Sequence, residues 1–178
     1  MNETKYEITP QVDATQEFIE IANDFANPLD IVREAISNSY DAKASKIWIS
    51  FDVVTQYGEA ILKISIKDNG NGMDDAGLQS FFDLGNSLRR GDPEAIGEKG
   101  HGTKVYFNSK QIEVISIKDG FRYHAVVDDP FRKLHNREIP KVFVNKTGVA
   151  AGETGTEVII QGYNNNRRDR FTHEILRD

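Results

Sequence analysis

The chain has 178 residues, a length typical of one domain that can bury a hydrophobic core. Its 28 acidic and 22 basic residues give a formal net charge of −6, which does not indicate nucleic-acid binding. The absence of cysteine excludes disulfides, thiolate metal sites and a cysteine nucleophile. No apolar run approaches the roughly 20 residues that span a bilayer, and the first residues lack an apolar signal region. We therefore expect a soluble, cytoplasmic domain with no membrane partner.

Apolar residues at helical spacing predict two helices near the N-terminus, at 15–26 and 29–44, with Pro28 between them. Thr15 is the expected cap of the first helix. The second helix is expected to bury one half of its surface, comprising Ile31, Val32, Ala35, Ile36 and Tyr40. Alternating apolar residues then predict strands at 46–54 and 60–67, which the intervening turn joins as an antiparallel hairpin.

The glycine-rich segment 68–102 follows, with a short helix expected at 75–83 and another at 103–109. Strands are predicted at 111–118 and 121–127, because Asp119-Gly120 is a strong hairpin signal. The polar stretch 129–153 is expected to hold only a short strand at 142–144, and a last strand is expected at 156–161. Residues 164–168 read as a loop, and a helix begins at 171. This order of helices and hairpins is compatible with an α+β fold.

Three polar side chains share the rim of the second helix. Glu34, Asn38 and Asp41 fall within about 60° of one another, beside the apolar face. Such a row is either a solvated helix face or a site. As a site, Glu34 would handle a proton and Asn38 would offer an oxygen to a hard cation such as Mg²⁺.

Two glycine-containing motifs follow. Asp68-Asn69-Gly70-Asn71-Gly72-Met73 comes directly after a strand, and is either a turn or a carboxylate placed beside backbone that a ligand can approach. Gly97, Gly100 and Gly102 lie within six residues ahead of a predicted helix. That loop is either a flexible surface segment or a cradle whose N–H groups bind phosphate. It matches neither the P-loop nor the dinucleotide fingerprint.

The order of these motifs is more specific than any one of them. E-x-x-x-N-S-x-D-A, D-N-G-x-G-M, G-x-x-G-x-G-x-K and then G-T-x-V, at Gly155-Thr156, span Glu34 to Val158. This series resembles the GHKL ATPases, the superfamily of gyrase B, the ninety-kilodalton heat-shock chaperones, sensor histidine kinases and MutL, with the MORC-type ATPases. The chain is most similar to the chaperone, MORC and MutL branches.

The resemblance implies a Bergerat-type α/β sandwich, in which helices cover one face of a mixed, mostly antiparallel sheet. It implies a mobile ATP lid at about 84–102 within a single ATP-binding domain, 1–178. In this family a following transducer domain supplies a lysine, so we expect the chain to be the N-terminal part of a longer protein. As an isolated domain it would be a weak ATPase.

The resemblance also implies the role of each site residue. Glu34 corresponds to the general base and Asn38 to the Mg²⁺ ligand, with Asp41 in the same motif. Asp68 corresponds to the carboxylate that reads adenine, and Thr156 to a threonine that shares a water with it. The remaining positions expected at the nucleotide are Gly70, Gly72 and Met73 near the base, and Gly97, Gly100, His101, Gly102 and Thr103 near the phosphates.

The expected function is Mg²⁺-dependent ATP binding and slow hydrolysis, used as a switch for conformation and homodimerisation. A non-hydrolysing ATP sensor or scaffold is the first alternative. A histidine-kinase catalytic module is the second, and the intact Glu34 argues against it because a kinase must keep water from attacking ATP.

Overall fold

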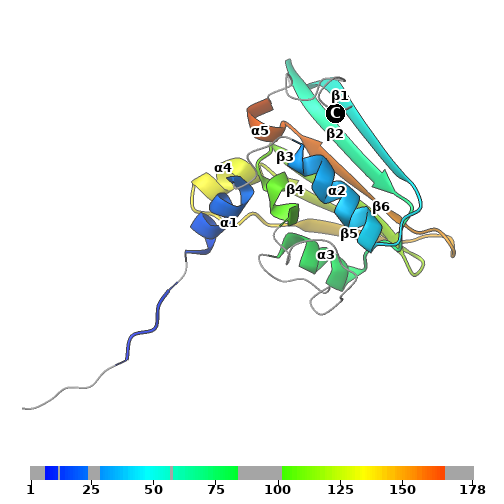
Figure 1. Ribbon diagram of the computed structural model, residues 1–178, viewed down its shortest axis with the longest axis horizontal. Coiled ribbons are helices and arrows are strands. Elements are labelled where there is room, and N and C mark those ends of the chain that lie inside the picture. Colours follow the sequence, from blue (N-terminus) through cyan, green and yellow to red (C-terminus); the bar gives the residue numbers. More distant parts are fainter. Residues whose placement is uncertain (1–6, 12, 24–28, 57, 84–101, 167–178) are drawn as a thin grey trace, which may run out of the picture.

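The computed structural model describes residues 7–11, 13–23, 29–56, 58–83 and 102–166. These residues form one six-stranded sheet, with the helices gathered on one of its faces (Figure 1). Every strand pairing in the described part is antiparallel. The α+β class and the predicted sandwich are therefore confirmed.

The elements follow the predicted order, with some shifted bounds. The helices are α1 (Ala14–Asn23), α2 (Asp30–Asp41), α3 (Asp75–Phe82), the 3₁₀ helix η1 (Gly102–Phe107), α4 (Pro130–His135) and α5 (Tyr163–Asn166). The strands are β1 (Ile47–Gln56), β2 (Glu59–Asp68), β3 (Gln111–Lys118), β4 (Phe121–Asp128), β5 (Phe143–Gly148) and β6 (Gly155–Gln161). The helix predicted from residue 171 lies outside the described residues, as does the end of the first predicted helix.

The strand order in the sheet is β1-β2-β6-β3-β4-β5. Two hairpins, β1–β2 and β3–β4, therefore flank β6, which pairs with β2 on one side and with β3 on the other. Ile160, for example, lies opposite both Ile64 and Ile112. The last strand of the series thus lies near the middle of the sheet.

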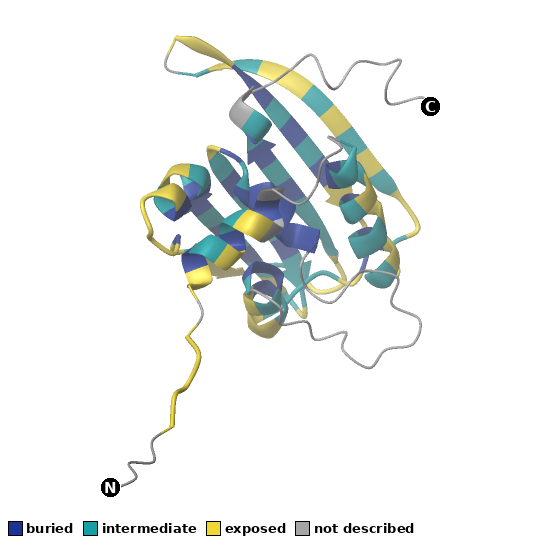
Figure 2. Ribbon diagram, turned by 60° about the vertical axis from the view of Figure 1, so that its left-hand side comes forward, coloured by how far each residue is buried: buried dark blue, intermediate teal, exposed yellow. Residues whose placement is uncertain are grey.

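The core lies between the sheet and the helices. Alternate residues of β2, β3, β4 and β6 are buried, as expected for strands that present one face to helices and the other to solvent (Figure 2). Ile64, Ile112, Val114 and Ile160 are fully buried on the helix-facing side. η1 is buried along its whole length and packs against α1, α2 and α3. It fills the centre of the helical layer.

Four expectations about the helices were wrong. Asp13, not Thr15, caps α1, because its carboxylate accepts hydrogen bonds from the Gln16 N–H and the Thr15 hydroxyl. On α2 the buried stripe is Ile31, Ala35 and Ser39, which leaves Ile36 and Tyr40 exposed. The predicted apolar half was too wide, because α2 packs through a single stripe.

The other two errors concern short helices. Residues 130–135 form α4, where Pro130 at the first turn starts a helix rather than breaking one. The predicted loop after residue 163 begins with the single turn α5. Within the described part of the chain, no helix has the length and apolar character needed to cross a membrane.

Candidate functional site

A cavity of about 370 Å³ lies between α2, α3, η1 and the ends of β2, β3 and β6. It brings together most of the residues predicted from the motifs. Those that line it are Glu34, Asn38, Asp41, Asp68, Gly72, Met73, Gly102, Thr103 and Thr156. Gly70 lies beside it, whereas Gly97, Gly100, His101 and the rest of the predicted lid before Gly102 lie outside the described residues.

Helix α2 forms one wall of the cavity along its length. The carboxylate of Glu34 and the side-chain amide of Asn38 are four residues apart and therefore share a face, and Asn38 Nδ2 donates to Glu34 Oε1 at 2.7 Å. Both side chains are half-buried. The pair therefore places an acid and an amide side by side at one end of the cavity. Asp41 lies near the other end of the helix.

Asp68 ends β2 at the bottom of the cavity and is 9% exposed. Its carboxylate accepts hydrogen bonds from the Ser39 hydroxyl at 3.2 Å and from the Gly70 N–H at 2.8 Å. It thus has one partner on α2 and one in the loop that follows its own strand. A buried carboxylate held by two donors stays in place, and can accept a further hydrogen bond from a ligand.

Glycines allow the loop after Asp68 to pack against its surroundings. A Cβ on Gly70 would approach the carbonyl oxygen of Ala42 to 2.7 Å. Gly72 has φ of +69°, and a Cβ there would overlap the carbonyl oxygen of Ile117. Both close approaches are to backbone, so only glycine fits at these two positions.

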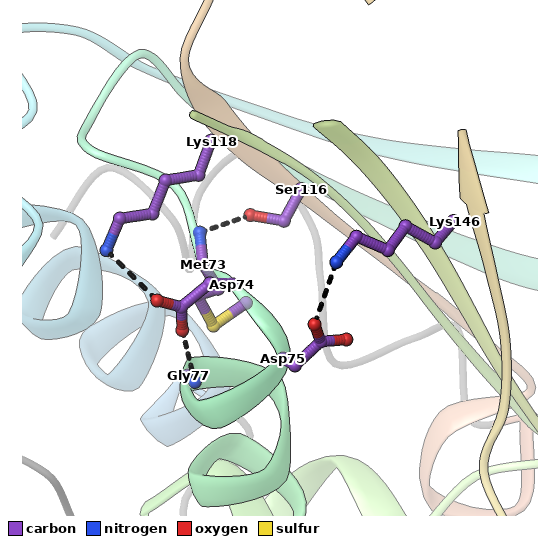
Figure 3. Close-up of polar contacts among 7 residues, drawn as sticks. All are labelled: Met73, Asp74, Asp75, Gly77, Ser116, Lys118 and Lys146. Atoms are coloured by element: carbon purple, nitrogen blue, oxygen red, sulfur yellow. Dashed lines mark hydrogen bonds and ion pairs between the residues drawn. The ribbon is translucent and has the colours of Figure 1, made fainter. Parts of the chain in front are cut away.

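Met73 and Thr156 are joined through Ser116 of β3. The Met73 N–H donates to the Ser116 hydroxyl at 2.7 Å (Figure 3). That hydroxyl also lies 2.8 Å from the Thr156 hydroxyl. Ser116 is fully buried, although nothing in its local sequence distinguishes it from other residues of its strand. It fixes the position of the loop relative to the end of β6.

Two ion pairs join the start of α3 to the sheet (Figure 3). Asp74 caps the helix by accepting from the Gly77 N–H at 2.8 Å, and its other oxygen lies 3.7 Å from Lys118 Nζ. Asp75 pairs with Lys146 at 3.0 Å. The capping bond and the Lys118 charge lower the pKa of Asp74. Lys118 is also the basic side chain among the described residues that line the cavity.

Helix η1 closes the end of the cavity near Glu34. The Cα of Gly102 lies against the Glu34 carboxylate, and any side chain at this position would overlap it. The Thr103 hydroxyl donates to the Phe81 carbonyl at 2.6 Å. Gly102 and Thr103 therefore line the cavity beside Glu34, and the backbone of η1 approaches the acid closely.

Lys104 is fully buried beside this end. Its ammonium group donates to the Phe81 carbonyl at 3.0 Å and to the Thr103 hydroxyl at 2.9 Å. Burial lowers the pKa of Lys104 to about 8, against the opposing influence of the Asp83 and Glu34 charges. The lysine thus joins η1 to the C-terminal turn of α3.

Comparisons with known proteins agree with this geometry. A family profile described as histidine kinase-, DNA gyrase B- and HSP90-like ATPase matches residues 27–149 of the 178. No curated protein matches the chain.

Similar solved structures include two ATPase regions of type II topoisomerases. The ATPase and transducer domains of DNA topoisomerase II from Balamuthia mandrillaris give a TM-score of 0.53 at 18% identity, over 74% of this chain and 36% of that one. The ATPase region of Saccharomyces cerevisiae topoisomerase II gives a TM-score of 0.56 at 16% identity, over 83% of this chain and 41% of that one. The chain spans less than half of either structure, and at these identities the likeness establishes the fold.

The match of the family profile over more than half of the chain agrees with the fold, with the order of the motifs and with the cavity they line. The chain belongs to the histidine kinase-, DNA gyrase B- and HSP90-like (GHKL) ATPase family and forms its ATP-binding domain.

Proposed function

We propose that the cavity binds ATP together with Mg²⁺ and hydrolyses it slowly, as a switch for conformation and homodimerisation. One observation is the main support: Asp68, at the end of β2, and the Glu34–Asn38 pair of α2 line the same 370 Å³ cavity. Between Glu34 and Ala42, which contacts the loop after Asp68, the helix rises about 12 Å. That span suits a ligand with a base at one end and phosphates at the other.

The base would lie at the Asp68 end. A carboxylate can accept a hydrogen bond from the exocyclic amine of adenine, whereas the carbonyl of guanine at the same ring position would be repelled. Thr156 lies beside Ser116 and would hold a water that bridges to the base. Gly70, Gly72 and Met73 would form the adjoining wall.

The phosphates would lie at the Glu34 end, against Gly102 and Thr103 at the start of η1. Gly97, Gly100 and His101, outside the described residues, would complete the phosphate loop. Asn38 fits a magnesium ligand, because Mg²⁺ prefers oxygen donors and binds through few protein groups beside phosphates and waters. The described residues contain no cluster of three or more histidine or acidic side chains that could hold a metal without the nucleotide. A bound Mg²⁺ would neutralise charge on the phosphates.

Glu34 would act as the general base, accepting a proton from the attacking water. Its carboxylate lies against the Gly102 backbone and accepts from Asn38, so its position is fixed from two sides. The second candidate is an ATP sensor or scaffold that does not hydrolyse ATP, in which nucleotide binding alone controls assembly. Within the family, an intact Glu34 favours the chaperone, MORC and MutL branches over the kinases.

Titration calorimetry with ATP and Mg²⁺ tests the binding site. Asp68→Asn should weaken ATP binding at least 10-fold in a folded protein, because the amide presents a donor where the carboxylate accepts. Asp52→Asn, the same change at an exposed position of β1, should bind like the wild type. Binding of wild-type strength in Asp68→Asn would contradict the adenine assignment.

A measurement of ATP hydrolysis distinguishes the slow ATPase from the ATP sensor that does not hydrolyse. Glu34→Ala should keep ATP binding and lose about 10²–10⁴ in turnover rate, the usual contribution of a general base. Glu153→Ala removes an exposed carboxylate elsewhere and is the matched control. A wild type that binds ATP but shows no turnover above Glu34→Ala would favour the sensor.

A further inference from the structure

The described part of the cavity wall carries four carboxylates and one ammonium group. The ammonium group belongs to Lys118, and the carboxylates belong to Glu34, Asp41, Asp68 and Asp74. Neither the sequence motifs nor the proposed roles use this lysine, because it directly precedes the Asp119-Gly120 turn and resembles any polar residue at the end of a strand. A lysine that lines a cavity is nevertheless a hydrogen-bond donor that a ligand can meet.

Lys118 is the last residue of β3 and lies at the Asp68 end of the cavity. Asp68, Thr156 and Ser116 are neighbours across three paired strands. Lys118 follows Ser116 by two residues, and side chains two apart in a strand point to the same face of the sheet. Figure 3 shows both side chains near the loop that leads into α3. The lysine therefore lies close to the proposed position of the base, and away from the Glu34 end.

Lys118 forms a weak ion pair with Asp74 (Figure 3). Its Nζ lies 3.7 Å from Asp74 Oδ2, whereas an N–H···O hydrogen bond spans about 2.7–3.2 Å. The two side chains are 34% and 45% exposed, and exposed pairs contribute little to stability. Asp74 caps α3 through its other oxygen, which accepts from the Gly77 N–H at 2.8 Å. Lys118 can therefore leave Asp74 without breaking the helix cap.

A lysine has three donors and no acceptor, so a ligand that replaces Asp74 as its partner must offer an acceptor. We infer that Lys118 exchanges Asp74 for an acceptor of the bound nucleoside, either a ring nitrogen of the base or a ribose oxygen. This role rests on the proposed function, because it requires the base to lie at the Asp68 end. It complements Asp68, which can only accept: one residue takes a hydrogen bond from the nucleoside and the other donates one.

Lys118→Met tests the inference, because methionine keeps most of the aliphatic stem and removes the ammonium group. The measurement is the dissociation constant by titration calorimetry for ATP, ADP and adenosine, in Mg²⁺ and in EDTA. All three constants should rise by the same factor, about 10-fold, the low end for a hydrogen bond from a charged group. The factor should be the same in Mg²⁺ and in EDTA. A lysine that bound a phosphate would instead weaken ATP and leave adenosine unchanged.

The matched control is Lys146→Met. Lys146 pairs with Asp75, the next residue of α3, at 3.0 Å, and its side chain is 42% exposed. It lies outside the residues that line the cavity. Lys146→Met removes a similar lysine from the same helix terminus and should bind all three ligands like the wild type.

Asp74→Asn tests the exchange of partners. Asparagine caps a helix about as well as aspartate, so the variant keeps α3 and loses only the charge that holds Lys118. Its affinity for adenosine should rise about 2–5-fold, the usual contribution of an exposed pair. Adenosine has no charge for Asp74 to repel, so the gain reports the released lysine. In a Lys118→Met background, Asp74→Asn should give no gain.

Analogues of ATP identify the acceptor. Each analogue replaces one ring nitrogen of adenine by CH or lacks one ribose hydroxyl. For the analogue without the acceptor that Lys118 uses, the wild type and Lys118→Met should have equal affinities. For every other analogue the difference of about 10-fold should remain, as it does for ATP.

Each other outcome overturns a specific statement. A loss confined to ATP and ADP assigns Lys118 to the phosphates, and unchanged constants for all three ligands leave it only the pair with Asp74. Either result contradicts the nucleoside contact, as does an undiminished difference for every analogue. An equal loss in Lys146→Met would indicate an indirect effect through α3 and would contradict it too. A wild type that binds no ATP rejects the proposed function itself.

Discussion

The two ends of the cavity are built in different ways. The strand end, comprising Asp68, Gly70, Gly72, Ser116 and Thr156, joins the ends of three neighbouring strands through hydrogen bonds and close backbone contacts. The helix end, comprising Glu34, Asn38, Gly102, Lys104 and Tyr106, brings α2 and η1 together, with the Glu34 carboxylate against the Gly102 backbone. One end is therefore part of the sheet, and the other is held between two helices.

This difference determines how each end responds to substitution. At the strand end an added atom meets backbone, which cannot move without disturbing the sheet. At the helix end it meets the flexible end of a side chain. An atom added to Gly70 or Gly72 at the strand end should therefore appear mainly as lost stability, and one added to Gly102 at the helix end mainly as lost function.

The strongest test of this comparison is Gly72→Ala. The new Cβ would overlap the Ile117 carbonyl, and φ of +69° is unfavourable for alanine. Strain and overpacking each cost about 1–3 kcal/mol, so we expect the free energy of unfolding to fall by about 4 kcal/mol. Urea denaturation measures it. Gly58 has φ of +78° but open space around a Cβ. Gly58→Ala should therefore lower the free energy of unfolding only by the cost of backbone strain, without the cost of overpacking.

The next effect concerns the buried Lys104. Its pKa of about 8 in the folded protein lies below the ordinary 10.5, so between these values the unfolded chain holds a proton that the folded protein has released. Stability should therefore rise from pH 8 to pH 10.5, by up to about 3 kcal/mol, and this contribution is absent below pH 8. Lys104→Met should remove the rise, as measured by urea unfolding at several pH values.

Lys110→Met controls for the titration of other groups, because Lys110 is exposed and pairs with Glu59 only at the surface. The Lys110→Met variant should therefore still become more stable between pH 8 and pH 10.5, as the wild type does. If Lys104→Met and the wild type have parallel pH profiles, the lysine is not buried in the way the structure describes.

Gly102→Ala is the counterpart of Gly72→Ala at the helix end. Its Cβ would overlap the Glu34 carboxylate, which can rotate away. We expect a loss of less than about 1 kcal/mol in stability and about 100-fold in ATP turnover, the lower end of the range for the contribution of a general base. A stability loss as large as that of Gly72→Ala would show that the two ends do not differ.

The smallest expected effect lies outside both ends, at the start of α3. Asp74→Ala removes the N-cap and should cost about 1 kcal/mol in stability. Asp75→Ala breaks only the exposed pair with Lys146 and should cost less than about 0.5 kcal/mol. Thermal unfolding of the two variants, side by side, measures the difference. Equal losses of stability in the two variants would mean that the hydrogen bond from the Gly77 N–H adds nothing to the effect of the Asp74 charge.

Much of the strand end could be predicted from the sequence. Asp68 follows a clear alternating strand, and glycines two and four residues later indicate close backbone approach. Ser116 could not be predicted, because its role depends on β3 lying next to β6, and pairing between distant strands leaves no local signal. The alternating pattern predicted where the strands lie along the chain, but not their order in the sheet.

At the helix end the sequence predicted Glu34, Asn38, Gly102 and Thr103, and missed Tyr106. Helical spacing shows which residues share a face of α2, but not which buried side chain of another helix lines the same cavity. The same limit explains Tyr40, which shares the predicted apolar half and yet is exposed. Periodicity gives a face, and tertiary packing decides how much of it is covered.

The central place of β6 also has a consequence for the order of folding. The two hairpins, β1–β2 and β3–β4, can each form from local contacts, but they share no pairing with each other. They become one sheet only when residues 155–161 insert between them, about a hundred residues after the partner residues of β2. Contacts at such separation form slowly, because a long loop must close first. During synthesis, Asp68 would therefore remain at an unpaired sheet edge until β6 arrives, and the cavity that Asp68 lines could not take shape before then.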